Sequence, residues 1–389
     1  MTVSAQSSRA ASSEQKPSAV VEGLLEVLPS GSGFLRLGAN AYLPADGDPF
    51  VPQSTIRRFG LRTGDKVAGE IGASPGRGKS PPLQSVTSVN GFPPEQARNR
   101  PDFNSLPATY PDERLTLEHP STGKRRELTP RIIDLIAPLG KGQRALIVAP
   151  SRAGKTTLLQ EILQGVSTNY PGATLLVLLV DERPEEVTEM QMLVYGEVIA
   201  SSFDCPPDRH VAVAEMVLEH ARRQVESGRD VVLVLDSLTR LARAYNNTER
   251  GTGRLLSGGI DSGALEKPKR FFGSARKVRG GGGSLTIVAT ALVDTGSRMD
   301  EVIFEEFKGT GNSEIVLDRE LADKRIYPAI NIEKSATRRE DLLIPPEDLD
   351  KVYNLRRVLH SLSVEDALQL LVKQMSDTRS NAELLSRLK

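Results

Sequence analysis

Tryptophan is absent from this sequence, cysteine occurs once, and positive and negative charges balance. Because aromatic residues make up only 4%, surfaces on which nucleic-acid bases stack must be few and local. The 50 lysines and arginines equal the 50 aspartates and glutamates, which excludes an overall basic field. The lone Cys205 excludes an internal disulfide and fits a reducing compartment. The sequence has neither a membrane-length apolar run nor a signal-peptide core, so we expect a cytoplasmic protein with no membrane partner.

The most informative motif is a phosphate-binding loop at residues 149–157, with the sequence APSRAGKTT. An apolar, strand-like run at 145–148 precedes it, and a helix-like segment follows. In such loops backbone N–H groups wrap the β-phosphate, a lysine reaches the β- and γ-phosphate oxygens, and a hydroxyl completes the Mg²⁺ shell. Lys155 and Thr156 fill these roles, whereas Ala149 replaces the usual first glycine. The motif predicts ATP and Mg²⁺ as ligands.

Two further apolar runs end in carboxylates at the spacing that an ATPase core needs. Residues 174–180 lead into Glu182, and residues 231–235 lead into Asp236. Because the carboxyl ends of parallel strands face the ligand crevice, Glu182 can polarise the attacking water. Asp236 has the place of the carboxylate that holds Mg²⁺ through water. The plain alternative is that these acids only cap strand ends, but together with the loop they favour phosphoryl transfer.

The composition along the chain divides it into four parts. Residues 1–19 are rich in serine and alanine and are expected to form a disordered tail. Residues 20–90 show short apolar alternations between Gly/Pro/Asp turns, which predicts a small β-barrel. Residues 91–127 are proline-rich and predict an extended linker. Residues 128–389 alternate apolar strands with helical segments and end in a helical stretch, which predicts an α/β domain with a mostly parallel sheet.

Long stretches of the chain resemble the family of the bacterial transcription termination factor Rho, an RNA-dependent hexameric ATPase. The shared words are RALIVAP (144–150), VDERPEEVTEM (180–190), DSLTRLARAYN (236–246), PKRFFG (268–273) and EEFKGTGN (305–312). The resemblance runs from about Val20 to the C-terminus. It implies an α/β protein in which an N-terminal OB-fold barrel, the primary RNA-binding domain, precedes a RecA-like P-loop ATPase domain, with ATP bound between neighbours in a homohexamer ring.

The resemblance also implies a primary RNA site on the barrel. Phe34 is the expected stacking residue, Phe50 a further aromatic, and Arg36 a phosphate contact, whereas Ser32 stands where the family usually has another aromatic. A nearby basic cluster, Arg57-Arg58-Phe59, is more simply interpreted as structural or as facing another subunit. The residues assigned to the primary site are Gly31, Ser32, Gly33, Phe34, Leu35, Arg36, Asp48, Pro49, Phe50, Gly78, Lys79 and Ser80.

For the motor, the resemblance assigns a catalytic set and an ATP-binding set. Arg338 matches the arginine finger offered to a neighbouring subunit, Tyr327 matches a residue that stacks on adenine, and Arg152 replaces a common lysine. The catalytic residues are Lys155, Thr156, Glu182, Asp236 and Arg338, of which Thr156 and Asp236 also serve the metal. The ATP-binding residues are Gly140, Lys141, Gly142, Gln143, Arg144, Ala145, Arg152, Ala153, Gly154, Lys155, Thr156, Thr157, Arg183, Arg325 and Tyr327.

Two loops match secondary RNA-binding segments that face the central hole of the ring. One is the glycine-rich segment 256–264, and the other, residues 294–298, follows an apolar strand and ends in Arg298 as a pore cation. Without the resemblance, both would be interpreted as exposed turns. The residues assigned to secondary RNA binding are Ser257, Gly258, Gly259, Thr295, Gly296, Ser297 and Arg298.

From the resemblance we expect an RNA-dependent ATPase and helicase that moves 5′ to 3′ along single-stranded, C-rich RNA and terminates transcription at the RNA polymerase elongation complex. Two other functions stay open at this point. One is a RecA-like motor on another polymer or a rotary ATP synthase-type subunit, which would lack RNA stimulation. The other is an RNA-binding regulator with ATP as a structural ligand, for which Ala149, Arg152 and Ser32 are warning signs.

Overall fold

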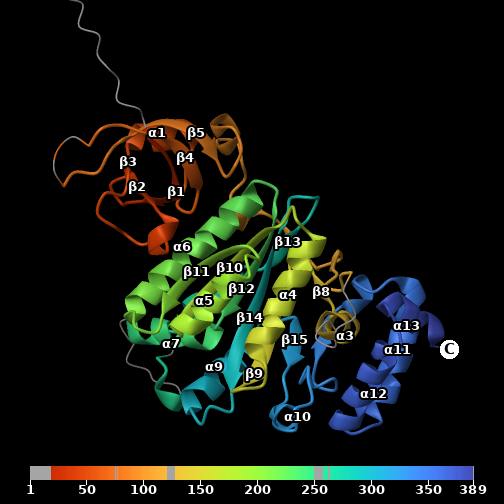
Figure 1. Ribbon diagram of the computed structural model, residues 1–389. Helices are drawn as coiled ribbons and strands as arrows, with labels where there is room; N and C mark the ends of the chain where they lie inside the picture. The colour runs from red at the N-terminus through yellow and green to blue at the C-terminus, as the bar shows by residue number, and fades with distance from the viewer. Residues whose placement is uncertain are drawn as a thin grey trace, which may run out of the picture.

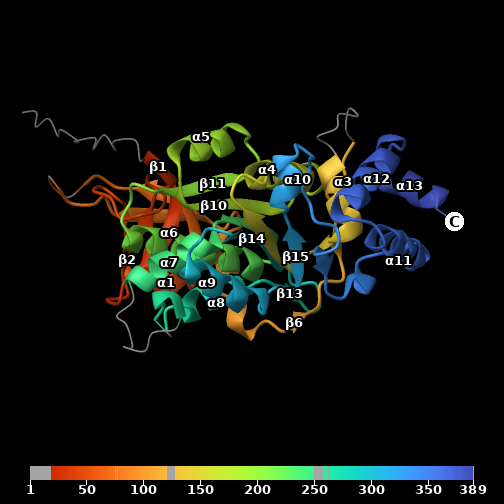
Figure 2. The same ribbon diagram turned by 90° about the horizontal axis from the view of Figure 1, so that it is seen from below.

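A computed structural model describes residues 19–74, 76, 78–120, 128–248, 257–261 and 263–388. The expected tail at 1–19 lies outside these residues apart from Ala19, which begins the first strand. The small β domain and the C-terminal helices lie at opposite ends of a central sheet (Figures 1 and 2). No helix among the described residues is long and apolar enough to cross a membrane.

The N-terminal domain is a five-stranded barrel in the order β3-β2-β1-β4-β5, with antiparallel neighbours. A bridge between Phe50 of β3 and Pro82 joins the two edges, so the sheet closes. Alternate residues such as Leu25, Leu35 and Val67 are fully buried and fill the interior, as period-two patterning requires. The elements are β1 (Ala19–Val27), β2 (Gly33–Arg36), β3 (Phe50–Val51), α1 (Gln53–Phe59), β4 (Lys66–Ile71) and β5 (Leu83–Val89).

The central sheet runs β11-β10-β12-β14-β9-β15-β16, and all neighbours from β11 to β15 are parallel. This confirms the predicted α/β fold. The strands are β9 (Arg144–Pro150), β10 (Thr174–Glu182), β11 (Glu197–Ser202), β12 (Asp230–Asp236), β13 (Arg276–Val278), β14 (Ser284–Val293), β15 (Ser313–Val316) and β16 (Ala336–Thr337).

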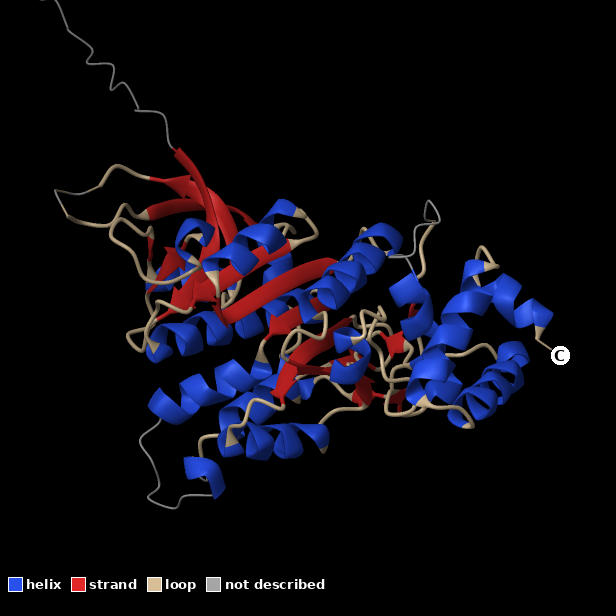
Figure 3. Ribbon diagram, turned by 60° about the horizontal axis from the view of Figure 1, so that its bottom comes forward, coloured by secondary structure: helices blue, strands red, loops and turns tan. Residues whose placement is uncertain are grey.

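Helices cover both faces of this sheet (Figure 3). Along β9 the buried side chains alternate, so that Ile147 belongs to the core beneath α4 and Leu146 to the core beneath α6. The helices are α3 (Leu128–Ile136), α4 (Lys155–Asn169), α5 (Pro184–Met192), α6 (Pro207–Glu226), α7 (Leu238–Thr248), α8 (Glu266–Phe272), α9 (Arg298–Lys308), α10 (Arg319–Asp323), α11 (Pro346–His360), α12 (Val364–Ser376) and α13 (Asn381–Arg387).

The segment predicted as an extended linker packs on both the barrel and the ATPase domain. It contains α2 (Pro94–Ala97), β6 (Ala108–Thr109), which pairs with β13, and β7 (Arg114–Leu115), which pairs with β8 (Leu139–Gly140). Residues 121–127 of the predicted linker lie outside the described residues. The prolines break regular structure, but the short strands still find partners on the neighbouring domain.

The barrel packs on helix α6 through buried polar contacts. The carbonyl of Gly64 lies 3.0 Å from Nδ1 of His220, and Arg62 forms a 3.0 Å ion pair with Glu226. Glu226 also accepts from the backbone N–H of Phe103 at 2.8 Å. These contacts hold the barrel against the ATPase domain at a defined place.

Candidate functional site

The phosphate-binding loop connects β9 to α4 at the C-terminal edge of the central sheet. Gly154 has φ of 92°, which favours glycine, and the backbone N–H groups of the first turn of α4 follow directly. Ala149 is a buried residue within β9 and has an ordinary strand backbone, so its methyl group meets no conformational obstacle. The departure from glycine at this position therefore leaves the loop intact.

Lys155, Glu182 and Asp236 meet in one cluster, as their strand-end positions predict. The Lys155 ammonium lies 2.6 Å from both oxygens of Asp236 and 3.1 Å from Oε1 of Glu182. Burial opposes the charge on Lys155, but the two carboxylates outweigh burial and raise its pKa. Thr290 of β14, which the sequence reasoning missed, donates to Asp236 Oδ1 at 2.7 Å. The cluster thus joins α4 to three neighbouring strands.

Glu182 is buried, and its pKa is raised to about 7, first by desolvation and then by the Asp236 carboxylate. A bulge in β10 places it, because the register shifts between Val180 and Glu182 and Asp181 has φ of 56°. Arg240 of α7, also missed from the sequence, donates to the Asp181 carbonyl at 2.5 Å and lies 3.3 Å from Glu182. A carboxyl group with a pKa near neutrality suits general-base chemistry.

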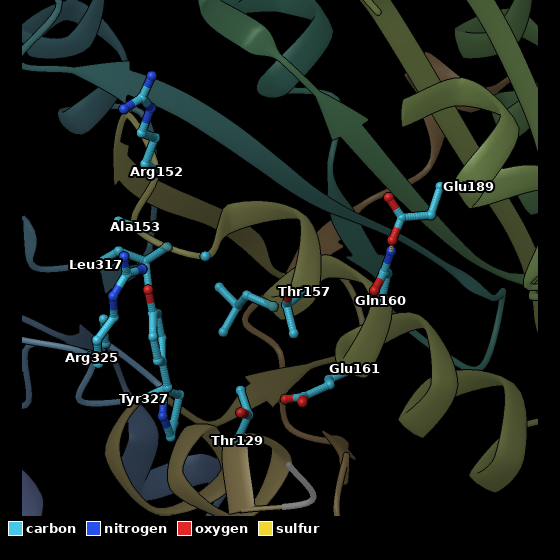
Figure 4. A pocket seen from close by; sticks show the side chains of 14 residues that line it. Thr129, Arg152, Ala153, Thr157, Gln160, Glu161, Glu189, Leu317, Arg325 and Tyr327 are labelled. Carbon is cyan, nitrogen blue, oxygen red and sulfur yellow. Dashed lines mark hydrogen bonds between the residues drawn. The ribbon is translucent and has the colours of Figure 1, made fainter. Parts of the chain in front are cut away.

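A cavity of about 730 Å³ lies beside the loop and is lined by Arg152, Ala153, Gly154, Thr157, Arg325 and Tyr327, among others. Figure 4 shows Arg325 and Tyr327 together on one side, with Thr157 across from them. Tyr327 is 40% exposed and lines this cavity. Thr156 lies next to Lys155 in the first turn of α4. Arg183 is exposed before α5, outside the lining of this cavity.

Six residues assigned to ATP binding lie at the sheet edge opposite the phosphate loop of their own chain, namely Gly140, Lys141, Gly142, Gln143, Arg144 and Ala145. They precede or begin β9, whereas the loop follows its end roughly 20 Å away. Their polar side chains are engaged locally. Gln143 donates to Asn312 Oδ1 at 2.7 Å, and Arg144 donates to the Thr310 carbonyl at 3.0 Å. The direction of β9, which runs from these residues toward the phosphate loop, is the feature of the sequence that predicts their position.

Arg338 lies at that same far edge. It follows β16, and its backbone N–H donates to the Asn312 carbonyl at 2.9 Å. The charge of Arg338, after burial, lowers the pKa of Arg144, so the two cations are near each other. Arg338 is exposed, and no acid within the described part of the chain forms an ion pair with it. Within one protomer it is therefore distant from Lys155.

On the barrel, Glu26, Phe34 and Phe50 are cross-strand neighbours on β1, β2 and β3. The two rings lie 5.7 Å apart, edge to face, and are only partly buried. Phe34 faces away from the core, which its neighbour Leu35 fills. The side chain of Leu35, which was assigned to the primary site, is therefore fully buried in the barrel.

Arg36 also differs from expectation, because its guanidinium is buried and bound. It pairs with Glu26 at 2.5 Å and with Asp48 at 2.7 Å, and it lies 5.0 Å from the Phe34 ring centre. Arg36 and Asp48 therefore support the aromatic pair and present no free cation to phosphate. Of the other assigned residues, Gly33 and Pro49 are buried, Gly31, Ser32 and Ser80 are partly exposed, and Gly78 and Lys79 are exposed.

The two predicted pore segments lie against each other. Gly258 has φ of 79°, and a Cβ there would come within 2.8 Å of the Met299 nitrogen, just after Arg298. Thr295 donates to Asp300 at 2.6 Å, and Asp300 pairs with Arg243 of α7 at 2.5 Å. Gly259, Gly296 and Arg298 are exposed, as is Ser257, and Ser297 is partly exposed. Leu256 and Ser262 of the first segment lie outside the described residues.

Comparison with solved structures supports the fold of the ATPase domain. An ATPase of a bacterial type III secretion system aligns with a TM-score of 0.56 and 24% identity, over 73% of this chain and 78% of that one. An ATP synthase subunit from Nanoarcheaum equitans aligns with a TM-score of 0.55 and 19% identity, over 67% and 64%.

Residues 21–95 match the Rho termination factor RNA-binding domain, and residues 130–337 match the nucleotide-binding domain of the ATP synthase alpha/beta family. Proteins named transcription termination factor Rho from Gemmatimonas aurantiaca and Cereibacter sphaeroides are 59% and 56% identical over 92% and 93% of this chain. The chain spans 48% of the first relative and 85% of the second. It joins an RNA-binding domain to a P-loop ATPase domain, and it belongs to the transcription termination factor Rho family.

Proposed function

We propose that this chain works in the cytoplasm as an RNA-dependent ATPase that moves 5′ to 3′ on single-stranded, C-rich RNA and terminates transcription at the RNA polymerase elongation complex. The observation that carries the proposal is the cluster of Lys155, Glu182 and Asp236 in a chain that also presents a solvent-facing aromatic pair on a barrel. The relatives' name supports the role in termination.

At the ATP site, each residue of the cluster has one task. Lys155 contacts the β- and γ-phosphates, and Glu182 accepts a proton from the attacking water. Thr156 and Asp236 would hold Mg²⁺, which neutralises charge on the phosphates when bound. The donor set fits this ion, because a hydroxyl and a buried carboxylate are hard oxygen ligands, and Mg²⁺ takes its remaining ligands from water and phosphate. Tyr327 stacks on the adenine.

The position of Arg338 favours a ring. Its exposed guanidinium lies at the sheet edge opposite its own phosphate loop, so in a homohexamer it reaches the ATP of a neighbour. There it offsets charge in the transition state, as arginine fingers do. The residues 140–145 lie at the same edge and face the same boundary.

RNA enters through the barrel and then the pore segments. The Phe34–Phe50 pair holds bases by stacking, and Gly258, Gly296 and Arg298 contact the strand in the central hole. The pore segments connect to the ATP site through α7, because Asp300 pairs with Arg243 while Arg240 on the same helix holds the Asp181 carbonyl. RNA in the pore thereby favours the hydrolytic arrangement of Glu182.

The test is ATP hydrolysis by the purified protein with poly(C), with single-stranded DNA and without polymer, alongside Lys155→Ala. Stimulation by RNA alone, lost in the variant, is the expected result. Equal turnover without polymer would point to another RecA-like ATPase. A wild-type rate no higher than that of Glu182→Gln would make ATP a structural ligand and defeat the proposal.

A further inference from the structure

Three exposed arginines lie on or next to two short helices beside the barrel, one of them against a partly exposed aromatic ring. Arg57 and Arg58 lie in the last turn of α1, next to Phe59, and the Arg58 guanidinium lies 5.0 Å from the centre of that ring. Arg98 follows α2 directly, and a Cβ on Gly60 would come within 3.3 Å of its Cα atom. We call Arg57, Arg58 and Arg98 the arginine patch.

The patch differs from the other arginines of this region in having no acidic partner. Arg36, Arg62 and Arg100 each form ion pairs with carboxylates. Over the described ranges, no ion pair forms at any of the three patch arginines, although Glu95 lies on the short helix that Arg98 follows. In a chain without net charge, the patch is thus a local excess of cations.

Favourable interaction with the helix dipole does not account for all three arginines of the patch. Cations near a helix C-terminus interact favourably with its dipole, which explains one arginine in the last turn of α1. A second arginine there and a third from a separate element gain little from that helix. Gathered and exposed, they form a surface suited to an anionic polymer.

Helix α1 connects the aromatic pair to the patch along the chain. Helix α1 follows β3 almost directly, and Gln53 in its first turn donates to the Ser30 carbonyl at 3.4 Å, beside Ser32. The helix is 7 residues long, so its far end lies roughly 10 Å further along. Two rings hold only one or two bases, whereas a single OB fold covers about 4–16 nucleotides. The remaining nucleotides therefore need more surface.

We propose that the arginine patch binds the phosphates of nucleotides that flank those on Phe34 and Phe50, and so extends the primary RNA site along α1. This inference rests on the proposed RNA-binding function. Contacts of this kind are independent of base identity, so the patch adds affinity and length to the site while the aromatic pair contacts the bases.

The experiment compares wild-type protein with the triple variant Arg57→Gln/Arg58→Gln/Arg98→Gln. Binding of a long cytidine oligomer of about 12 nucleotides, and of a short one that covers only the rings, is measured over a range of salt. Three lost phosphate contacts lower the slope of log K against log salt by about 2 for the long oligomer and leave the short one unchanged. Affinity for the long oligomer falls roughly tenfold or more.

The matched control removes three exposed arginines from the ATPase domain and C-terminal helices, Arg270, Arg319 and Arg387, with the same change in net charge. An unchanged slope in the patch variant, or an equal fall in the control, overturns the inference. If the triple variant fails to fold, Arg57→Gln/Arg58→Gln tests the same point with a slope change of about 1.4. Wild-type protein that binds neither oligomer would instead defeat the proposed function itself.

Discussion

The guanidinium of Arg240 lies 3.3 Å from Oε1 of Glu182 and also donates to the backbone carbonyl of Asp181 at 2.5 Å. A residue of helix α7 thus holds both the bulge of β10 and the carboxylate that the bulge presents. Lys155 approaches Glu182 from α4. The charge on Glu182 is therefore controlled by two cations from two different helices.

Replacing Arg240 with Gln should move the pH dependence of ATP hydrolysis toward alkaline pH. Burial raises the pKa of Glu182 to about 7, and the charge of Arg240 opposes that rise. Without Arg240 the pKa rises further, so less of the ionised base is present at neutral pH. The rising limb of kcat against pH, measured at saturating ATP and RNA, should shift upward. An identical rising limb of kcat against pH in Arg240→Gln and wild type would contradict this assignment. The Glu182→Gln variant gives the rate in the absence of the general base.

Removing Lys155 should destabilise the nucleotide-free protein as well as abolish hydrolysis. Lys155→Ala leaves two buried carboxylates, Glu182 and Asp236, without their shared cation, which costs about 3 kcal/mol or more. Urea unfolding measures the loss. Thr156→Val is the matched control, because it removes a neighbouring hydroxyl from outside the ion cluster and should lower activity with little loss of stability.

The interaction between Lys155 and Asp236 provides a second test of the ion cluster. Because Lys155 and Asp236 are in contact, the double variant Lys155→Ala/Asp236→Asn should lose less stability than the sum of the single variants, by roughly 0.5–3 kcal/mol. Strict additivity would mean that the ion pair does not form in solution.

The aromatic pair on the barrel should set the affinity for single-stranded RNA. Phe34→Ala removes one stacking ring and should weaken poly(C) binding by about 1–3 kcal/mol while leaving RNA-independent ATP hydrolysis unchanged. Ser32→Phe should strengthen binding, because Ser32 is partly exposed just before β2. Ser32→Ala controls for the lost hydroxyl. Equal affinities of the Phe and Ala variants at position 32 would show that this position does not meet a base.

The order of strands and polar residues along the chain predicted that Lys155, Glu182 and Asp236 lie together. Each of Lys155, Glu182 and Asp236 ends or follows an apolar strand, and a parallel sheet brings those ends to one edge. The sequence analysis assigned no role to Arg240 or Thr290, although Arg240 lies within the shared word at 236–246. Their contacts depend on how α7 and β14 pack, which no local pattern encodes.

A match of short segments does not show in which direction a strand runs or which face of the sheet a residue occupies. Residues 140–145 lie close to the motif in sequence, yet β9 carries the chain away from them toward the phosphate loop. Leu35 and Arg36 were assigned to the primary RNA site, but strand alternation turns Leu35 inward, and Glu26 and Asp48 bind Arg36. Ion pairs between strands depend on register, which composition and spacing did not reveal.

Arg338 offers the sharpest test of assembly, because its own phosphate loop lies at the other edge of the sheet. Arg338→Ala should lower kcat about a thousandfold or more with little change in ATP affinity. When the Arg338→Ala and Lys155→Ala proteins are mixed, RNA-stimulated hydrolysis should return. Some subunit boundaries then combine an intact Lys155 with an intact Arg338 from the neighbour. A mixture of Lys155→Ala with Glu182→Gln is the matched control, because both residues serve the same side of the boundary and no complete site can form. Recovery in the first mixture alone establishes that the finger acts between subunits. Recovery in neither mixture would mean that Arg338 serves the same side of the boundary as Lys155, which contradicts the assignment.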